Sequence, residues 1–75
     1  MENKKTFVEN DLQEFCKKLD TNIDKIVYEE SKYYQNEAVI TFYKNGRKVV
    51  TNVTDNSYGT TAYYVLKDLM YQEIF

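Results

Sequence analysis

Hydrophobic residues recur every three or four positions in the first part of the chain. Within the stretch TFVENDLQEFCKKLDTNI this spacing selects Val8, Leu12, Phe15, Cys16 and Leu19. Such residues share one face of a helix with 3.6 residues per turn, so we expect all five in the core. Thr6 followed by Glu9 matches a capping box, which would start the helix there. Asn10 and Gln13 offer a competing start one turn later.

From Ile23 onward the pattern changes to alternation, and β-branched and aromatic residues become frequent. IDKIVYEES predicts a first strand, and EAVITFYKNGRKVVTNVT predicts two more strands around Asn45 and Gly46. An Asn-Gly pair between two alternating runs is the strongest short-range signal for a hairpin with a two-residue turn. The loop YYQN joins the first two strands. Its length leaves open whether Val27 or Tyr28 faces inward.

A two-residue turn would also determine the pairing of the hairpin strands, beginning with Lys44 opposite Arg47. Side chains alternate between the two faces of a strand. The predicted core face therefore consists of Ala38, Ile40, Phe42, Val49 and Val53. The opposite face would carry Val39, Thr41, Tyr43, Lys48, Val50 and Asn52. No predicted element covers this second face, so we expect an open, half-apolar sheet surface.

The stretch SYGTTAYYVLKDLMYQEIF predicts a second helix, capped by Asp55, Asn56 or Ser57. On a helical wheel one arc forms a core stripe of Tyr58, Ala62, Val65, Leu66 and Leu69. The opposite arc holds Tyr64, Lys67, Asp68, Tyr71 and Phe75. We call this second set the tyrosine ridge, with Lys67 and Asp68 as its rim.

The tyrosine ridge is the first candidate for a partner-binding site. Tyrosine supplies a large contact area with little loss of conformational entropy, and it is enriched at protein interfaces. The alternative interpretation is that these rings are ordinary surface residues without a role. A second candidate surface combines the open sheet face with the basic hairpin tip, namely Val39, Tyr43, Lys44, Arg47, Lys48 and Val50.

The order of elements predicts an α+β fold of αβββα type, with a three-stranded antiparallel sheet and both helices on one face. We expect one compact domain over residues 1–75. A core of this size supplies only about 3 to 5 kcal/mol without a disulfide, a metal or a partner. The chain has a single cysteine and no histidine. We therefore expect stabilisation by association, as a homodimer or a tight complex that buries the open sheet face or the tyrosine ridge.

Residues that carry catalytic or metal chemistry are scarce. Without histidine there is no imidazole base, and the acidic residues are scattered along the chain. Cys16 lies on the predicted apolar helix face, where we expect it to be buried and unreactive. The sequence therefore predicts a protein that is not an enzyme and that binds no metal or cofactor. Neither a secretory signal nor a membrane-spanning run is present, which favours a cytoplasmic protein without membrane contact.

The αβββα layout is similar to that of double-stranded RNA-binding domains, and NVTDNSYGTTAYYVLKDLM resembles their last strand and second helix. Those domains place a lysine cluster at the start of that helix, whereas here SYGTTAYY contains no cation before Lys67. A formal net charge of −2 also gives a poor electrostatic footprint for duplex binding. Nucleic-acid binding through Tyr43, Lys44, Arg47 and Lys48 at the hairpin tip is thus the alternative function. A solvated turn is the other interpretation of this tip.

In size, acidity, composition and element order the chain resembles the small inhibitors that phages and mobile elements encode against host defences, anti-CRISPR proteins in particular. Asn, Lys and Tyr are abundant in it, and the acidic residues outnumber the basic ones by 12 to 10. The resemblance implies a stoichiometric inhibitor in the host cytoplasm that occupies the nucleic-acid or partner surface of a nuclease complex. The expected partner is accordingly a protein.

Overall fold

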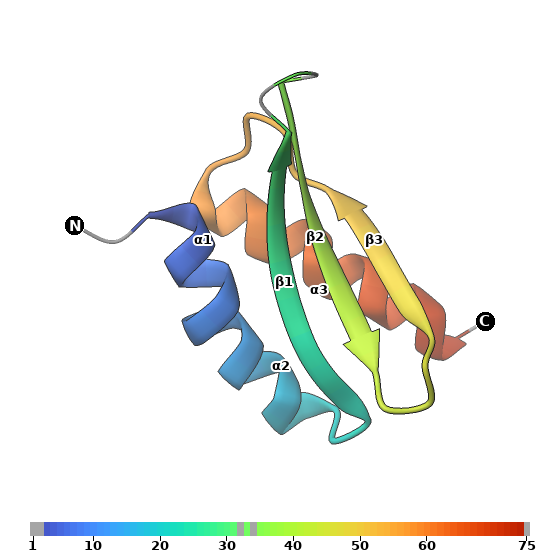
Figure 1. Cartoon of the computed structure of the whole chain (residues 1–75). Coiled ribbons are helices and arrows are strands. Elements are labelled where there is room, and N and C mark those ends of the chain that lie inside the picture. The colour runs from blue at the N-terminus through green and yellow to red at the C-terminus, as the bar shows by residue number, and fades with distance from the viewer. Residues whose placement is uncertain (1–2, 32, 34, 75) are drawn as a thin grey trace.

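The chain forms a helical segment, then an antiparallel sheet and then a second helix, in the predicted order. The computed structural model describes residues 3–31, 33 and 35–74, except for the side chains of residues 73 and 74. The elements are α1 (Lys4–Thr6), η1 (Phe7–Leu12), α2 (Gln13–Leu19), β1 (Ile23–Ser31), β2 (Asn36–Tyr43), β3 (Lys48–Asn52) and α3 (Tyr58–Ile74). The strands form one sheet in the order β1-β2-β3 (Figure 1). The predicted α+β fold with a three-stranded antiparallel sheet is confirmed.

The first three helical pieces run on without a break, and they begin earlier than the sequence suggests. Asn3 is the N-cap, and its Oδ1 accepts a hydrogen bond of 2.8 Å from the backbone N–H of Thr6. The predicted capping box is therefore wrong, because Thr6 already lies within the helix. Glu9 does not cap the helix and binds the sheet instead. Its carboxylate accepts a hydrogen bond from the backbone N–H of Tyr28.

The middle piece of this helix, η1, has π-helical hydrogen bonding. A π-helix has a wider turn than an α-helix, so residues four apart remain close to one line. That line is the buried face, made of Val8, Leu12 and Cys16. Phe15 follows Leu12 by three residues, and Leu19 follows Cys16 by three. Both side chains point outward, with exposed fractions of 50% for Phe15 and 65% for Leu19. Their predicted place in the core is wrong.

The hairpin between β2 and β3 has a three-residue loop in place of the predicted two-residue turn. The backbone N–H of Tyr43 donates to the carbonyl of Arg47 at 2.8 Å, and that of Gly46 donates to the carbonyl of Tyr43 at 3.0 Å. Gly46 has a φ of 90°, a left-handed conformation in which a side chain is strained. A type I turn followed by such a glycine is the usual form of this loop.

One extra loop residue reverses the two faces of β2. Ile40 pairs with Val50 and Phe42 with Lys48. The buried residues of β2 are consequently Val39, Thr41 and Tyr43, whereas Ala38, Ile40 and Phe42 are half-buried on the other face. The predicted faces of β2 are thus wrong. The β3 prediction is confirmed for Val49 and Val53, which are buried, and for Val50, which is exposed.

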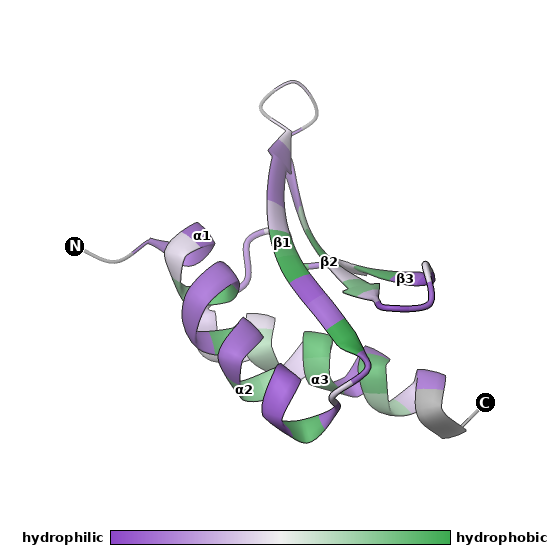
Figure 2. Cartoon of the chain, turned by 60° about the horizontal axis from the view of Figure 1, so that its bottom comes forward, coloured by the Kyte–Doolittle hydropathy of each residue, from purple (hydrophilic) through white to green (hydrophobic). Residues whose placement is uncertain are grey.

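The remaining strand and helix complete a single core. In β1 Ile26 and Tyr28 are buried, which answers the question that the YYQN loop left open. Both helical segments lie on the same side of the sheet in Figure 2. The core unites residues of both helices and all three strands, including Leu12, Cys16, Val39, Val65 and Leu69. The predicted burial of Cys16 is confirmed, and burial raises the pKa of its thiol to about 11.

Candidate protein-binding surface

The outward side of α3 presents the described part of the tyrosine ridge. Tyr64, Lys67 and Tyr71 are all exposed. The ammonium Nζ of Lys67 lies 5.9 Å from the ring centroid of Tyr64 and 5.9 Å from that of Tyr71. This distance allows weak cation–π attraction to both rings, which links them along the helix. Phe75 lies outside the described residues.

Asp68 does not belong to the rim of this ridge. Its side chain is half-buried, and its Oδ2 accepts a hydrogen bond of 2.8 Å from the Thr51 hydroxyl of β3. The reason is a rotation of the helix relative to the predicted wheel. Thr61, Val65 and Leu69 are its buried residues, while the predicted core residue Tyr58 stays exposed and stacks on Phe7 at 5.1 Å. The prediction for Asp68 is therefore wrong.

Further apolar side chains surround the ridge. One hollow lies between α2 and α3, with Leu19, Leu66 and Met70 in its lining. A second hollow is lined by Tyr63, Leu66, Lys67, Met70 and Tyr71. The two hollows adjoin at Leu66 and Met70, which line both of them, and we call them together the apolar groove. Met70 is 62% exposed although it is wholly apolar.

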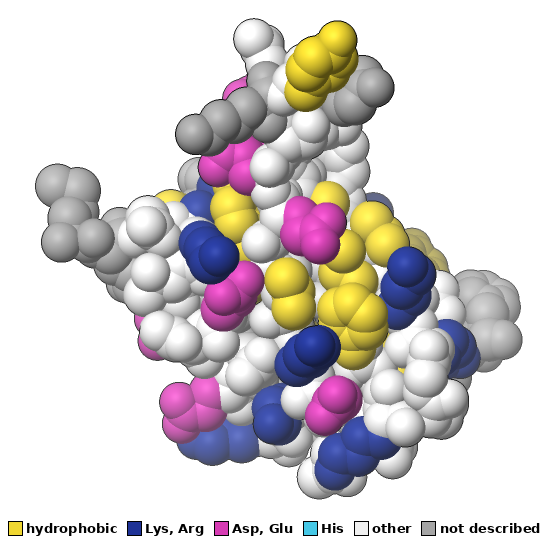
Figure 3. Space-filling view, viewed as in Figure 1, with side chains coloured by type: hydrophobic (Ala, Val, Ile, Leu, Met, Phe, Trp, Pro, Cys, Tyr) yellow, Lys and Arg dark blue, Asp and Glu magenta, His cyan; other side chains and the backbone are white. Residues whose placement is uncertain are grey.

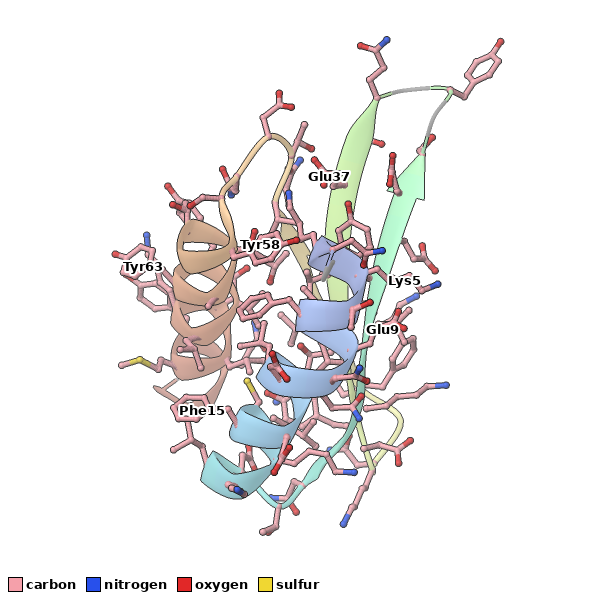
Figure 4. All side chains as sticks on the ribbon, turned by 90° about the vertical axis from the view of Figure 1, so that its left-hand side faces the viewer. Lys5, Glu9, Phe15, Glu37, Tyr58 and Tyr63 are labelled. Carbon is pink, nitrogen blue, oxygen red and sulfur yellow. The ribbon has the colours of Figure 1, made fainter. Side chains whose placement is uncertain are left out.

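Phe15 extends this apolar area on the neighbouring helix. Figure 4 shows Phe15 and Tyr63 on the side of the helices that faces away from the sheet. We name the whole area the helical apolar surface, which comprises Phe15, Leu19, Tyr63, Leu66, Met70 and Tyr71. Phe15 and Leu19 are not among the predicted partner-binding residues, because the helix pattern places them in the core. No sequence signal identifies them, because their spacing fits the buried face of a regular α-helix and their exposure depends on the π-helical turn of η1.

The open face of the sheet holds a smaller apolar patch. Figure 3 shows it as a hydrophobic area bordered by charged side chains. Val27, Ala38, Ile40 and Phe42 are half-buried there, and Lys25 Nζ lies 5.1 Å from the centroid of the Phe42 ring. Only Val50 on this face is a large apolar residue that is mostly exposed, at 57%, among the described residues.

The second candidate surface is divided between two sides of the sheet. Val39 and Tyr43 are buried on the helix side, so their predicted exposure on the open face is wrong. Lys44, Arg47 and Lys48 remain exposed at the hairpin tip. The guanidinium carbon of Arg47 lies 4.9 Å from the Tyr43 ring centroid. The ring thus supports the arginine from within the fold and offers no free stacking face to a base.

No protein-family model, curated protein or solved structure matches this chain.

The strongest electrostatic feature is a cluster around Glu37 at the start of β2. Its Oε1 accepts a hydrogen bond of 2.7 Å from Lys4 Nζ and another from the Tyr28 hydroxyl, and its Oε2 accepts one of 3.0 Å from the Asp55 backbone N–H. These donors hold the pKa of Glu37 at about 2, with Lys4 contributing most. Burial and the neighbouring carboxylate raise the pKa of the Tyr28 hydroxyl.

This cluster joins three distant parts of the chain. It connects the first helix, the sheet and the loop that leads into α3. Glu37 accepts all three of these hydrogen bonds, and Lys4 Nζ also donates to the Val53 carbonyl at 3.4 Å, an arrangement typical of a structural brace. Among the described residues no group of three or more cysteine and acidic side chains could hold a metal ion. No helix in the described ranges has the length and apolarity needed to cross a membrane.

Proposed function

We propose that this protein is a small, non-enzymatic protein that binds another protein through its helical apolar surface and thereby inhibits or adapts it. The observation that carries the proposal is the apolar groove between α2 and α3, continued by exposed rings along α3. Contiguous apolar surface of this kind marks interaction sites in soluble proteins. The composition of the area, rich in tyrosine with one methionine, is also typical of interfaces.

The groove suggests what the partner presents. Leu66 and Met70 line a hollow that suits an apolar anchor side chain, and the flexible thioether of Met70 can adapt to its shape. Tyr63 and Tyr71 border the same hollow and would pack against the sides of the anchor. Lys67 beside them favours an acidic or carbonyl group next to the anchor.

For the identity of the partner we propose a host-defence nuclease complex of the CRISPR type. This proposal rests on the resemblance of the chain to phage-encoded inhibitors in size, acidity and αβββα order. A protein of this kind acts in stoichiometric amounts in the host cytoplasm. It occupies a surface that the nuclease needs and performs no chemistry itself.

Affinity capture with paired variants tests the proposed surface. Met70→Asp places a charge in the groove, whereas Gln72→Asp places the same charge on an exposed position of α3 outside it. We expect Met70→Asp to abolish capture of the partner and inhibition of its nuclease activity, and Gln72→Asp to retain both. Equal binding by the two variants would refute the proposed surface.

A salt titration with nucleic acid tests the alternative. Duplex RNA and DNA are titrated with the protein at low and moderate salt. We expect no sub-micromolar binding, because the basic hairpin tip has few cations and no free ring. Tight binding that weakens steeply with salt would contradict the proposal.

A further inference from the structure

The two outer edges of the sheet are treated differently. Side chains of the first helical segment cover the edge of β1. Gln13 Oε1 accepts a hydrogen bond of 2.7 Å from the Ile26 backbone N–H, and Glu9 Oε2 accepts one of 3.0 Å from the Tyr28 backbone N–H. An uncovered edge offers a row of backbone groups that can pair with another strand. The helix side chains close this edge to such pairing.

The outer edge of β3 has no comparable cover. The Val53 N–H donates to the Glu37 carbonyl at 3.0 Å, and the Tyr43 N–H donates to the Arg47 carbonyl at 2.8 Å. In an antiparallel ladder these bonds alternate, so the backbone groups of Lys48, Val50 and Asn52 point away from β2. Within the described part of the chain, no strand lies beyond β3 and no side chain is hydrogen-bonded to these three groups.

We propose that β3 pairs with β3 of a second copy of this chain, antiparallel and around a two-fold axis at Val50. The two three-stranded sheets then become one continuous sheet of six strands. In this register Val50 faces its counterpart and Lys48 faces Asn52 of the other copy, so every outward backbone group of β3 has a partner. A two-fold contact of this kind is self-complementary and closed.

Two observations favour a second copy as the occupant. Val50 is the one large apolar residue of the open face that is mostly exposed among the described residues, and the pairing covers it with an identical side chain. The charges also fit. Arg47 and Lys48 lie at the start of β3, and Asn52 and Asp55 lie at or beyond its end. Antiparallel pairing brings each basic end beside the other copy's uncharged and acidic end.

This interface is separate from the proposed function. Figure 4 shows Phe15 and Tyr63 of the helical apolar surface on the side of the helices that faces away from the sheet, and no residue of this surface belongs to β3. Loss of the dimer therefore leaves the apolar groove intact. A failure of one proposal can be distinguished from a failure of the other.

Sedimentation of matched variants tests the pairing. Val50→Lys places two like charges opposite each other at the two-fold axis, whereas Val27→Lys places a lysine on the same sheet face but on β1. We expect the wild type and Val27→Lys to be dimers at tens of micromolar. Val50→Lys should raise the dissociation constant about tenfold or more. A wild-type monomer refutes the proposal, and so does a monomeric Val27→Lys, which would indicate face-to-face packing of the sheets.

Amide hydrogen exchange of the wild type provides a test that does not depend on the folding of a variant. The outward amides of Lys48, Val50 and Asn52 should exchange more slowly as the protein concentration rises. The inward amides of Val49 and Thr51 serve as the control, because β2 protects them in monomer and dimer alike. A dimer in which the outward amides show no concentration dependence overturns the proposed pairing.

Discussion

Glu37 shows how a single side chain can hold distant segments together. It receives hydrogen bonds from Lys4, Tyr28 and Asp55, which belong to the first helix, β1 and the loop before α3. Little in the sequence could have revealed it. Glu37 is one of 12 acidic residues, and its partners stand 33, 9 and 18 positions away. Only the folded register brings them together.

The cluster predicts acid sensitivity. The pKa of Glu37 is lowered from 4.5 to about 2 in the folded protein. Its contribution to the free energy of unfolding is therefore complete above about pH 4.5 and is lost as the pH falls toward about 2. Glu37→Gln should lower stability at neutral pH by about 2 kcal/mol, because it leaves the Lys4 charge unpaired.

Urea unfolding at several pH values measures this effect. The difference between the wild type and Glu37→Gln should shrink as the pH falls through that window. A difference that stays constant from neutral pH down to pH 2 would show that the carboxylate charge contributes nothing.

The hairpin illustrates at the scale of an element what could be predicted and what could not. Alternation and Asn-Gly located the two strands and the turn between them correctly. They could not decide between a loop of two residues and one of three, because Asn45 and Gly46 suit both. One residue of loop length was enough to exchange Tyr43 and Phe42 between the two faces of the sheet.

The two glycines of the chain provide a matched pair that tests this loop. Gly46 has a φ of 90°, whereas Gly59 lies in α3 with open space where a Cβ would be. Gly46→Ala should cost about 1 to 2 kcal/mol, since a side chain is strained in the left-handed region. Gly59→Ala should instead stabilise by up to about 1 kcal/mol, because alanine favours a helix. Equal thermal shifts would contradict the left-handed conformation of Gly46 in this loop.

The two sides of α3 should likewise differ in their mutational response. Leu69 is buried, so Leu69→Ala should destabilise the protein by about 2 to 5 kcal/mol. Tyr71 is exposed, so Tyr71→Ala should cost less than about 0.5 kcal/mol and yet weaken partner binding by about 1 kcal/mol or more. A melting curve and a binding titration on both variants decide the matter. If Tyr71→Ala unfolds the protein, the helix is oriented differently.

For the whole molecule, the α+β class and the three-stranded antiparallel sheet could be derived from the sequence, but the candidate site only in part. The wheel of α3 correctly placed Tyr64, Lys67 and Tyr71 outside. It could not show that Phe15 and Leu19 of the neighbouring helix lie outside as well, because their exposure depends on the π-helical turn of η1. The groove is a property of two helices that are distant in sequence and packed on a common sheet.

Two interfaces on one small chain have a consequence for binding strength. In the proposed dimer each copy keeps its own helical apolar surface. A partner that carries two copies of the recognised surface could then be held at both, and the second contact would form at a high effective concentration. Val50→Lys should in that case weaken inhibition of such a partner without changing the groove.

The capping of β1 by Glu9 and Gln13 limits how far the sheet can grow. A sheet with two free edges could add copies at both ends without limit and form fibres, whereas one with a single free edge stops after one addition. These two side chains thus act as a terminator against polymerisation. We expect the double variant Glu9→Ala, Gln13→Ala to form extended assemblies that increase light scattering and thioflavin fluorescence. Adding Val50→Lys to this double variant should suppress those assemblies, because the β3 edge of each chain would then no longer pair with another copy.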